Sequence, residues 1–72
     1  MMTKKIHEFT KEDIEQLATD YKIDKELSED EIYEILETWA YECYNMKNNA
    51  SVYVADMGRK DDKYYIIIGE VP

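Results

Sequence analysis

Two segments of this chain have nearly the same pattern of residues, typical of the start of a helix, and they constrain the fold more than any other feature. Residues 9–14 read FTKEDI and residues 27–32 read LSEDEI. Thr10 and Ser28 are residues that cap helices, and an acid stands three positions after each of them, as in a capping box. A hydrophobic residue before each cap matches one four positions into the helix, as in a hydrophobic staple. Both segments therefore predict the start of a helix.

The residues after each start repeat at helical spacing. The first apolar stripe consists of Ile14, Leu17, Ala18 and Tyr21. The second consists of Ile32, Ile35, Leu36, Trp39, Cys43 and Met46. Spacings of three and four residues place each set on one face of an α-helix. We expect helices over about residues 11–22 and 29–47, joined by a short linker as a helical hairpin or corner.

The rest of the chain is typical of strands. Residues 51–57 and 63–71 are rich in β-branched and aromatic residues, and the polar segment 58–62 between them reads as a hairpin loop. Residues 3–8 alternate weakly and could add a short N-terminal strand. The expected fold is therefore α+β: two helices followed by an antiparallel β-hairpin, as one small domain over residues 1–72. We expect the core to form near Ile14, Leu17, Trp39 and Ile67.

The charge of the chain is concentrated in one segment. The formal net charge is −8 over 72 residues. Residues 1–7 carry +2 and residues 43–72 are neutral, whereas residues 8–42 hold thirteen acids and three lysines, a net −10. Such a concentration serves either solubility or binding to a basic partner.

On the second expected helix, part of this acidity lies on one face. At 100° per residue, Glu34, Glu37 and Tyr41 lie opposite the apolar stripe, with Tyr33 and Tyr44 flanking it. Tyrosine is enriched at protein interfaces, where its ring supplies contact area and its hydroxyl stays wet. The candidate partner-binding residues are Asp30, Tyr33, Glu34, Glu37, Tyr41 and Tyr44.

Parts for catalysis are scarce. The chain has one His, one Cys and two distant glycines, so no phosphate-binding glycine loop can form, and we expect neither an enzyme nor a cofactor. Cys43 falls in an apolar stripe and should be buried and inert. His7 should be a solvent-exposed bystander in an N-terminal arm.

One segment has the length of a calcium-binding loop. Asp20 to Glu31 spans twelve residues between two helices, as in an EF-hand. Lys22 and Lys25, however, occupy positions where a ligand and a turn glycine belong, and helix capping explains Ser28 and Glu31 more simply. We therefore expect no metal site.

In size, acidity and lack of catalytic residues, the chain is similar to small acidic inhibitors of CRISPR nucleases, restriction enzymes and repair glycosylases that phages and plasmids encode. We expect a DNA-mimic-like inhibitor that occupies a basic nucleic-acid-binding surface of a host protein. The alternative is a generic interaction module or an antitoxin-like regulatory subunit. A small winged helix that binds DNA directly is disfavoured, because its reading helix would bring six acids to a polyanion.

The remaining expectations concern location and assembly. No apolar run reaches the roughly 20 residues that a membrane span needs, and the first residues lack an apolar signal core. The single cysteine favours a reducing compartment, so we expect a cytoplasmic protein. A homodimer is an open possibility for so small a domain.

Overall fold

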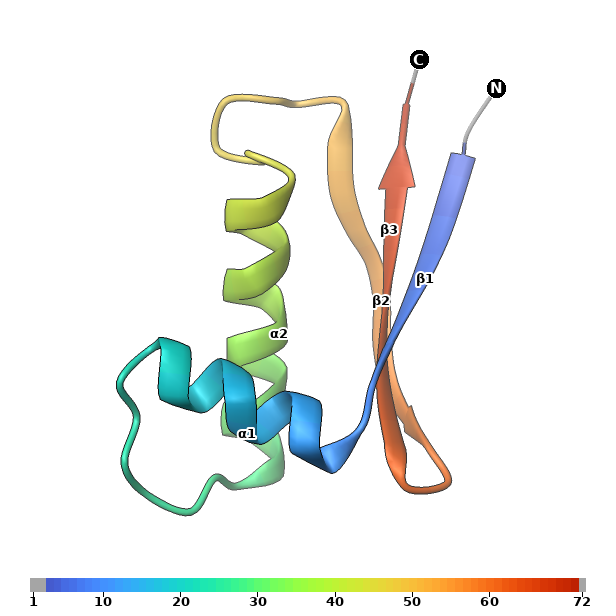
Figure 1. The fold of residues 1–72 in the computed structure, drawn as a ribbon. Coiled ribbons are helices and arrows are strands. Elements are labelled where there is room, and N and C mark those ends of the chain that lie inside the picture. Colours follow the sequence, from blue (N-terminus) through green and yellow to red (C-terminus); the bar gives the residue numbers. More distant parts are fainter. Residues whose placement is uncertain (1–2, 72) are drawn as a thin grey trace.

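The computed structural model describes residues 3–71. Its elements follow in the order β1 (Thr3–Phe9), α1 (Lys11–Asp20), α2 (Glu29–Cys43), β2 (Val52–Lys60) and β3 (Lys63–Glu70). The α+β prediction is confirmed (Figure 1). The possible N-terminal strand is real and one residue longer than expected. No helix in the described range is long and apolar enough to cross a membrane.

The three strands form an antiparallel sheet in the order β1-β3-β2. β1 pairs along its whole length with β3, from Thr3 opposite Glu70 to Phe9 opposite Tyr64. β2 completes the predicted hairpin with β3, and a β-bulge interrupts its pairing between Val54 and Asp56. The last strand is therefore the centre of the sheet, and the first and second strands are its edges.

Both helices lie on the same face of the sheet (Figure 1). Helix α2 runs along the strands, and helix α1 crosses α2. The side chains of Leu36, Ile66 and Ile68 are fully buried between the two layers. Ile14 is buried as predicted, and Leu17 and Trp39 pack against the core while remaining partly exposed. Ile67 was predicted in the core, and this prediction is wrong. Because side chains alternate along a strand, Ile66 and Ile68 face the helices and Ile67 faces away.

The helix starts agree with the sequence. Thr10 with Asp13, and Ser28 with Glu31, each form a reciprocal capping box. The helix ends come earlier than predicted, since Lys22 (φ 59°) and Asn45 (φ 51°) adopt the left-handed conformation. After α1, the N–H groups of Lys22 and Ile23 donate to the carbonyls of Thr19 and Ala18, which is a Schellman motif.

The same motif follows α2, and it determines whether Cys43 is buried or exposed. The N–H groups of Asn45 and Met46 donate to Glu42 and Tyr41, and Met46 turns back into the core with 8% of its surface exposed. The apolar stripe of α2 therefore ends before Cys43, the last helical residue. The prediction of a buried Cys43 is wrong, because this thiol is exposed.

The hairpin turn is shorter than the predicted loop. Only Asp61 and Asp62 form it, and Gly58 lies within β2. A Cβ on Gly58 would lie 2.6 Å from Cζ of Tyr65, its partner across the strands. Gly69 accommodates the ring of Tyr53 in the same way. These glycines provide close packing under tyrosine rings, so neither marks a turn.

Candidate functional site

Four predicted residues share the side of α2 that faces solvent: Asp30, Glu34, Glu37 and Tyr41. All four are exposed, and Tyr41 keeps 47% of its surface accessible. Their spacing of four, three and four residues places them in one row along the helix. At 1.5 Å per residue the row is about 16 Å long. We call these four residues the acidic ridge.

The carboxylates of the acidic ridge form no ion pair with the cations of the described residues. Within residues 3–71 the ion pairs are Lys25 with Glu31 and Lys63 with Glu8. Neither pair includes a ridge residue. The ridge therefore presents three adjacent negative charges to whatever approaches it, and their mutual repulsion would be relieved by a cationic partner.

The structure does not bring the two flanking tyrosines to the ridge in the same way. The Tyr33 hydroxyl donates to Glu29 Oε1 at 3.2 Å, and its ring packs edge-on against Tyr64, with centroids 5.7 Å apart. Partial burial, and then the hydrogen bond to Glu29, raise the pKa of Tyr33. Tyr33 thus lies beside the ridge as part of the helix–sheet packing.

Tyr44 turns away from the ridge toward β1. Its hydroxyl lies 2.5 Å from His7 Nε2, and its ring is edge-on to Trp39, with centroids 6.3 Å apart. The expectation that His7 is a solvent-exposed bystander is therefore wrong. His7 is half-buried and meets the Trp39 ring edge-on at 5.1 Å. The sequence contains a feature that indicates this position. His7 lies two residues from Phe9, and the alternation of side chains along a strand puts both on the helix-covered face.

A hollow lies directly beside the acidic ridge, where α2 passes β2. Its volume is about 480 Å³. It is lined by Glu37, Tyr41, Met46, Val52, Tyr53, Val54, Asp56 and Met57. Glu37 and Tyr41 thus border an indentation with a partly apolar floor, which could receive one side chain of a partner. The helix pattern alone gave no sign of it, since it depends on which strand lies next to α2.

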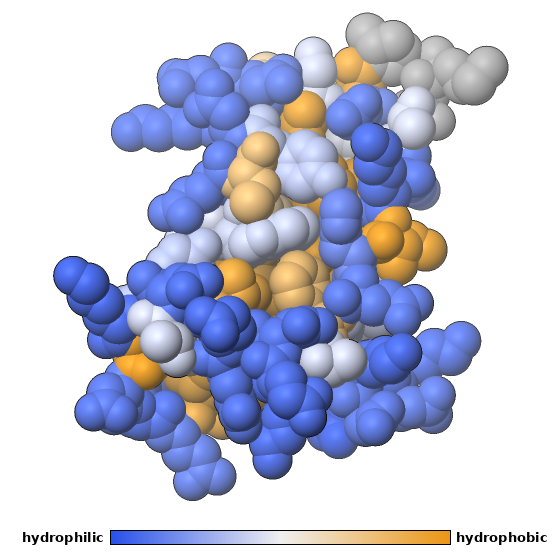
Figure 2. All heavy atoms as spheres, in the orientation of Figure 1, coloured by the Kyte–Doolittle hydropathy of each residue, from blue (hydrophilic) through white to orange (hydrophobic). Residues whose placement is uncertain are grey.

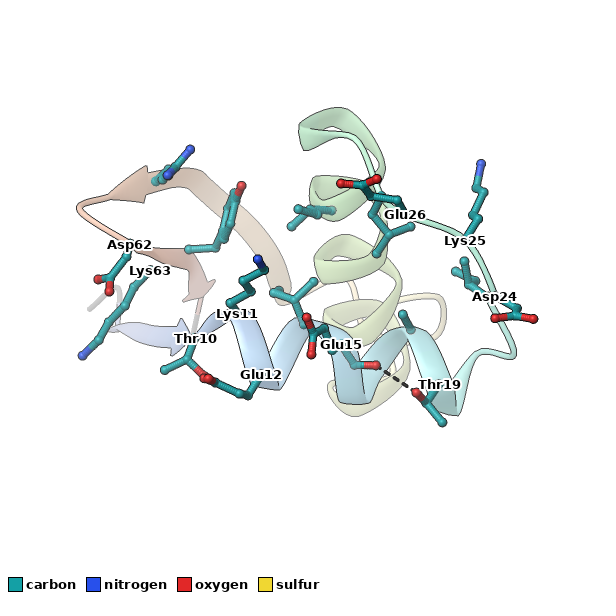
Figure 3. A pocket seen from close by; sticks show the side chains of 17 residues that line it. Thr10, Lys11, Glu12, Glu15, Thr19, Asp24, Lys25, Glu26, Asp62 and Lys63 are labelled. Atoms are coloured by element: carbon teal, nitrogen blue, oxygen red, sulfur yellow. Dashed lines mark hydrogen bonds between the residues drawn. The ribbon is translucent and has the colours of Figure 1, made fainter.

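A larger hollow, about 890 Å³, lies between α1, the loop after it and the hairpin end of the sheet (Figure 3). Its labelled charged side chains carry both signs, with Asp62 and Lys63 at one end and Asp24 and Lys25 at the other. Among the described residues no polar or charged side chain is buried. General acid–base catalysis commonly relies on desolvating a titratable group to tune its pKa, and this hollow has no group so placed.

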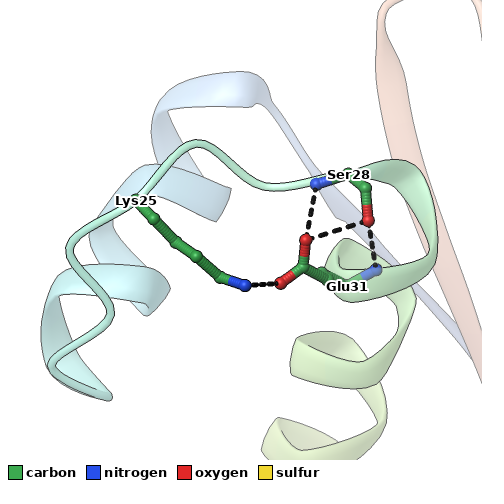
Figure 4. Close-up of polar contacts among 3 residues, drawn as sticks. All are labelled: Lys25, Ser28 and Glu31. Carbon is green, nitrogen blue, oxygen red and sulfur yellow. Dashed lines mark hydrogen bonds and ion pairs between the residues drawn. The ribbon is translucent and has the colours of Figure 1, made fainter.

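The twelve-residue loop from Asp20 to Glu31 is organised by a helix cap. Glu31 accepts hydrogen bonds from the backbone N–H and hydroxyl of Ser28 and forms an ion pair with Lys25 (Figure 4). The contact with Lys25, followed by those with Ser28, lowers the pKa of Glu31 to about 2. In residues 3–71 no three His, Cys, Asp or Glu side chains gather as metal ligands. Glu31, the last ligand position of an EF-hand, serves the start of α2 instead.

Comparison with family models, curated proteins and solved structures gave no match to this chain.

Proposed function

We propose that this protein is a small non-enzymatic binding protein whose acidic ridge docks on a basic nucleic-acid-binding surface of another protein and blocks it. This is the mode of action of DNA-mimic inhibitors of the anti-CRISPR or anti-restriction type. The observation that carries the proposal is the row of exposed carboxylates on α2 that form no ion pair with the described residues.

The spacing of the ridge is compatible with such mimicry. From Asp30 to Glu37 the helix advances about 10.5 Å and presents three carboxylates. One strand of duplex DNA presents three phosphates over about 7 Å of axis. The ridge is therefore a sparser array than a DNA strand, but a cleft lined with flexible lysines and arginines can adapt to it.

Tyr41 and the neighbouring hollow would add contacts that phosphates cannot make. Charge complementarity speeds association and selects partners more than it strengthens binding. A half-exposed tyrosine beside a partly apolar indentation supplies the contact area that holds the complex together. The ridge therefore combines an electrostatic component with an anchor.

A titration tests this proposal. The protein is titrated against a panel of purified CRISPR nucleases, restriction enzymes and other DNA-binding proteins at about 50 and 300 mM salt, with duplex DNA as competitor. We expect salt-weakened binding that excludes DNA. The double variant Glu34→Lys/Glu37→Lys, and separately Tyr41→Ala, should weaken it at least tenfold.

The matched control is Asp24→Lys/Glu26→Lys, which changes the net charge equally at exposed positions of the loop before α2. This control should bind within about threefold of the wild type after allowance for long-range charge. Equal losses in both double variants, or affinity that does not change with salt, would contradict docking through the ridge. Binding that resists salt and leaves DNA bound would instead support a generic interaction module.

A further inference from the structure

The free edge of β1 is the most open hydrogen-bonding surface of the described chain. β1 pairs only with β3, so the backbone groups on its other side have no strand partner in residues 3–71. The other edge strand, β2, carries a β-bulge, a feature that disrupts further pairing. β1 is paired in continuous register over all seven of its residues. It can therefore accept another strand along its whole length.

β1 also exposes a large hydrophobic side chain. Ile6 has 63% of its surface accessible, more than any other large hydrophobic residue of the described chain. Figure 2 shows hydrophobic atoms protruding among hydrophilic ones on the β1 side of the molecule. Ile6 lies opposite Ile67 in the register, on the sheet face that the helices leave uncovered. Lys4 and Glu8 flank it on the same face, because alternate residues of a strand share a face.

We propose that two copies of this chain associate by antiparallel pairing of their β1 strands, with Ile6 opposite Ile6, to form a continuous six-stranded sheet. Ile6 is the middle residue of Thr3–Phe9. This register therefore gives every residue of β1 a cross-strand partner. It places Lys4 of each copy opposite Glu8 of the other, which makes two symmetric charge pairs, and directly opposed unlike charges stabilise a strand pair.

Neighbouring registers lose this complementarity. A shift by two residues in one direction puts Lys5 opposite Lys5 and Lys4 opposite Ile6. A shift by two in the other direction puts Glu8 opposite Ile6. A shift of the register by one residue requires one copy to be turned upside down relative to the other. The uncovered face of one sheet would then continue into the helix-covered face of the other. The Ile6-centred register alone combines full overlap, paired charges and a continuous uncovered face.

The surroundings of β1 favour association at this edge. Most of the negative charge lies in residues 8–42, whereas residues 1–7 carry +2, so this edge is where two acidic copies repel each other least. Lysines on an edge strand normally prevent pairing. Here Lys4 of each copy would meet Glu8 of the other. The pairing would also join Ile67, Ile6 and their counterparts into one stripe of four isoleucines.

The dimer should be weak and dependent on concentration. A single pair of seven-residue strands buries far less than the about 800 Å² per partner of a standard interface. Sedimentation of the full chain from 10 µM to 1 mM should therefore show a monomer–dimer equilibrium. Circular dichroism of every variant verifies that the monomer stays folded.

Charge variants then test the register. Lys4→Glu should raise the dissociation constant about tenfold, because it creates two like-charge contacts. Adding Glu8→Lys should restore dimerisation by reversing both charges, although it also removes the contact of Glu8 with Lys63 at 3.8 Å. Lys60→Glu is the matched control, since it makes the same charge change on β2, and it should leave the dimer intact.

Crosslinking tests the same geometry independently. In a Cys43→Ser background, Ile6→Cys should form a disulfide-linked dimer under mild oxidation. Lys4→Cys and Glu8→Cys should each stay monomeric alone and crosslink when the two variants are mixed. A monomer at 1 mM, a dimer indifferent to Lys4→Glu, or crosslinks that form equally at all three positions would overturn the proposal. None of these outcomes depends on the acidic ridge.

Discussion

Ile66 and Ile67 are chemically identical neighbours on β3, and the fold predicts very different consequences for truncating each to alanine. Ile66 is fully buried beneath the helices, whereas Ile67 lies on the uncovered face of the sheet and is partly exposed. Each substitution removes the same three carbons and makes the same change in β propensity. The difference between the two variants therefore isolates burial.

The expected magnitude for Ile66→Ala follows from its full burial. Three buried carbons at about 0.8 kcal/mol each give about 2.4 kcal/mol. The remaining cavity brings the loss of unfolding free energy to about 3–5 kcal/mol. A domain of this size has only about 4–11 kcal/mol of stability, so Ile66→Ala should be marginally folded. Ile67→Ala should cost less, about 1–2 kcal/mol, since its side chain is partly exposed and no helix covers it, so its loss leaves no closed cavity.

Urea unfolding of both variants, followed by circular dichroism, measures the two losses. The slope of free energy against urea should be the same as in the wild type if both variants unfold in one step. Thermal unfolding should show the same order, with a shift of roughly 4–8 °C per kcal/mol. Equal losses, or a larger loss for Ile67→Ala, would mean that the helices cover the other face of the sheet.

Three further outcomes are expected. Lys22→Gly should raise the unfolding free energy by about 0.5–1 kcal/mol, because Lys22 holds a left-handed conformation that glycine adopts without strain. Urea unfolding measures this change, and a lower unfolding free energy in the variant would contradict the prediction. Glu31→Gln should reduce the acid sensitivity of the fold: the lowered pKa of Glu31 stabilises the folded state above the ordinary value of 4.5, and this contribution is lost as the pH falls toward about 2. The free energy of unfolding of both proteins is measured from pH 6 to 2. The same dependence on pH in the wild type and in Glu31→Gln would refute this prediction. Tyr44→Phe should cost about 1 kcal/mol by removing the hydrogen bond to His7, whereas Tyr41→Phe, at a residue with 47% of its surface exposed, should cost almost nothing.

The sequence was most informative where the determinants are local. Both capping boxes involve residues three positions apart, so they could be identified without knowledge of the rest of the molecule. The acidic ridge followed for the same reason, because helix geometry fixes its four residues relative to one another. The α+β class needed only the change from helical spacing to β-rich segments.

The errors came from residues whose positions depend on distant partners. The run YYIII on β3 has no alternation, so its phase is set by the helices that cover it, and Ile67 was assigned to the wrong face. His7 is positioned by Trp39 and Tyr44, more than thirty residues away. Tyr44 was placed by extending helical geometry past Cys43, where the left-handed Asn45 ends that geometry. Gly58 looked like a turn residue because nothing local reveals the Tyr65 ring above it.

The central place of β3 has a consequence for how the molecule assembles. Both edge strands pair with β3, which follows them in the chain, so β1 has no strand partner in the described residues until β3 has been synthesised. Thr3 and Glu70 are also register partners, which brings the beginning and end of the sheet together (Figure 1). Linking these ends and reopening the chain near Asn48 would turn the sheet into a simple meander, β2-β3-β1. Such a circular permutant would replace the longest-range pairing with a local hairpin, and folding rates rise as contacts become more local.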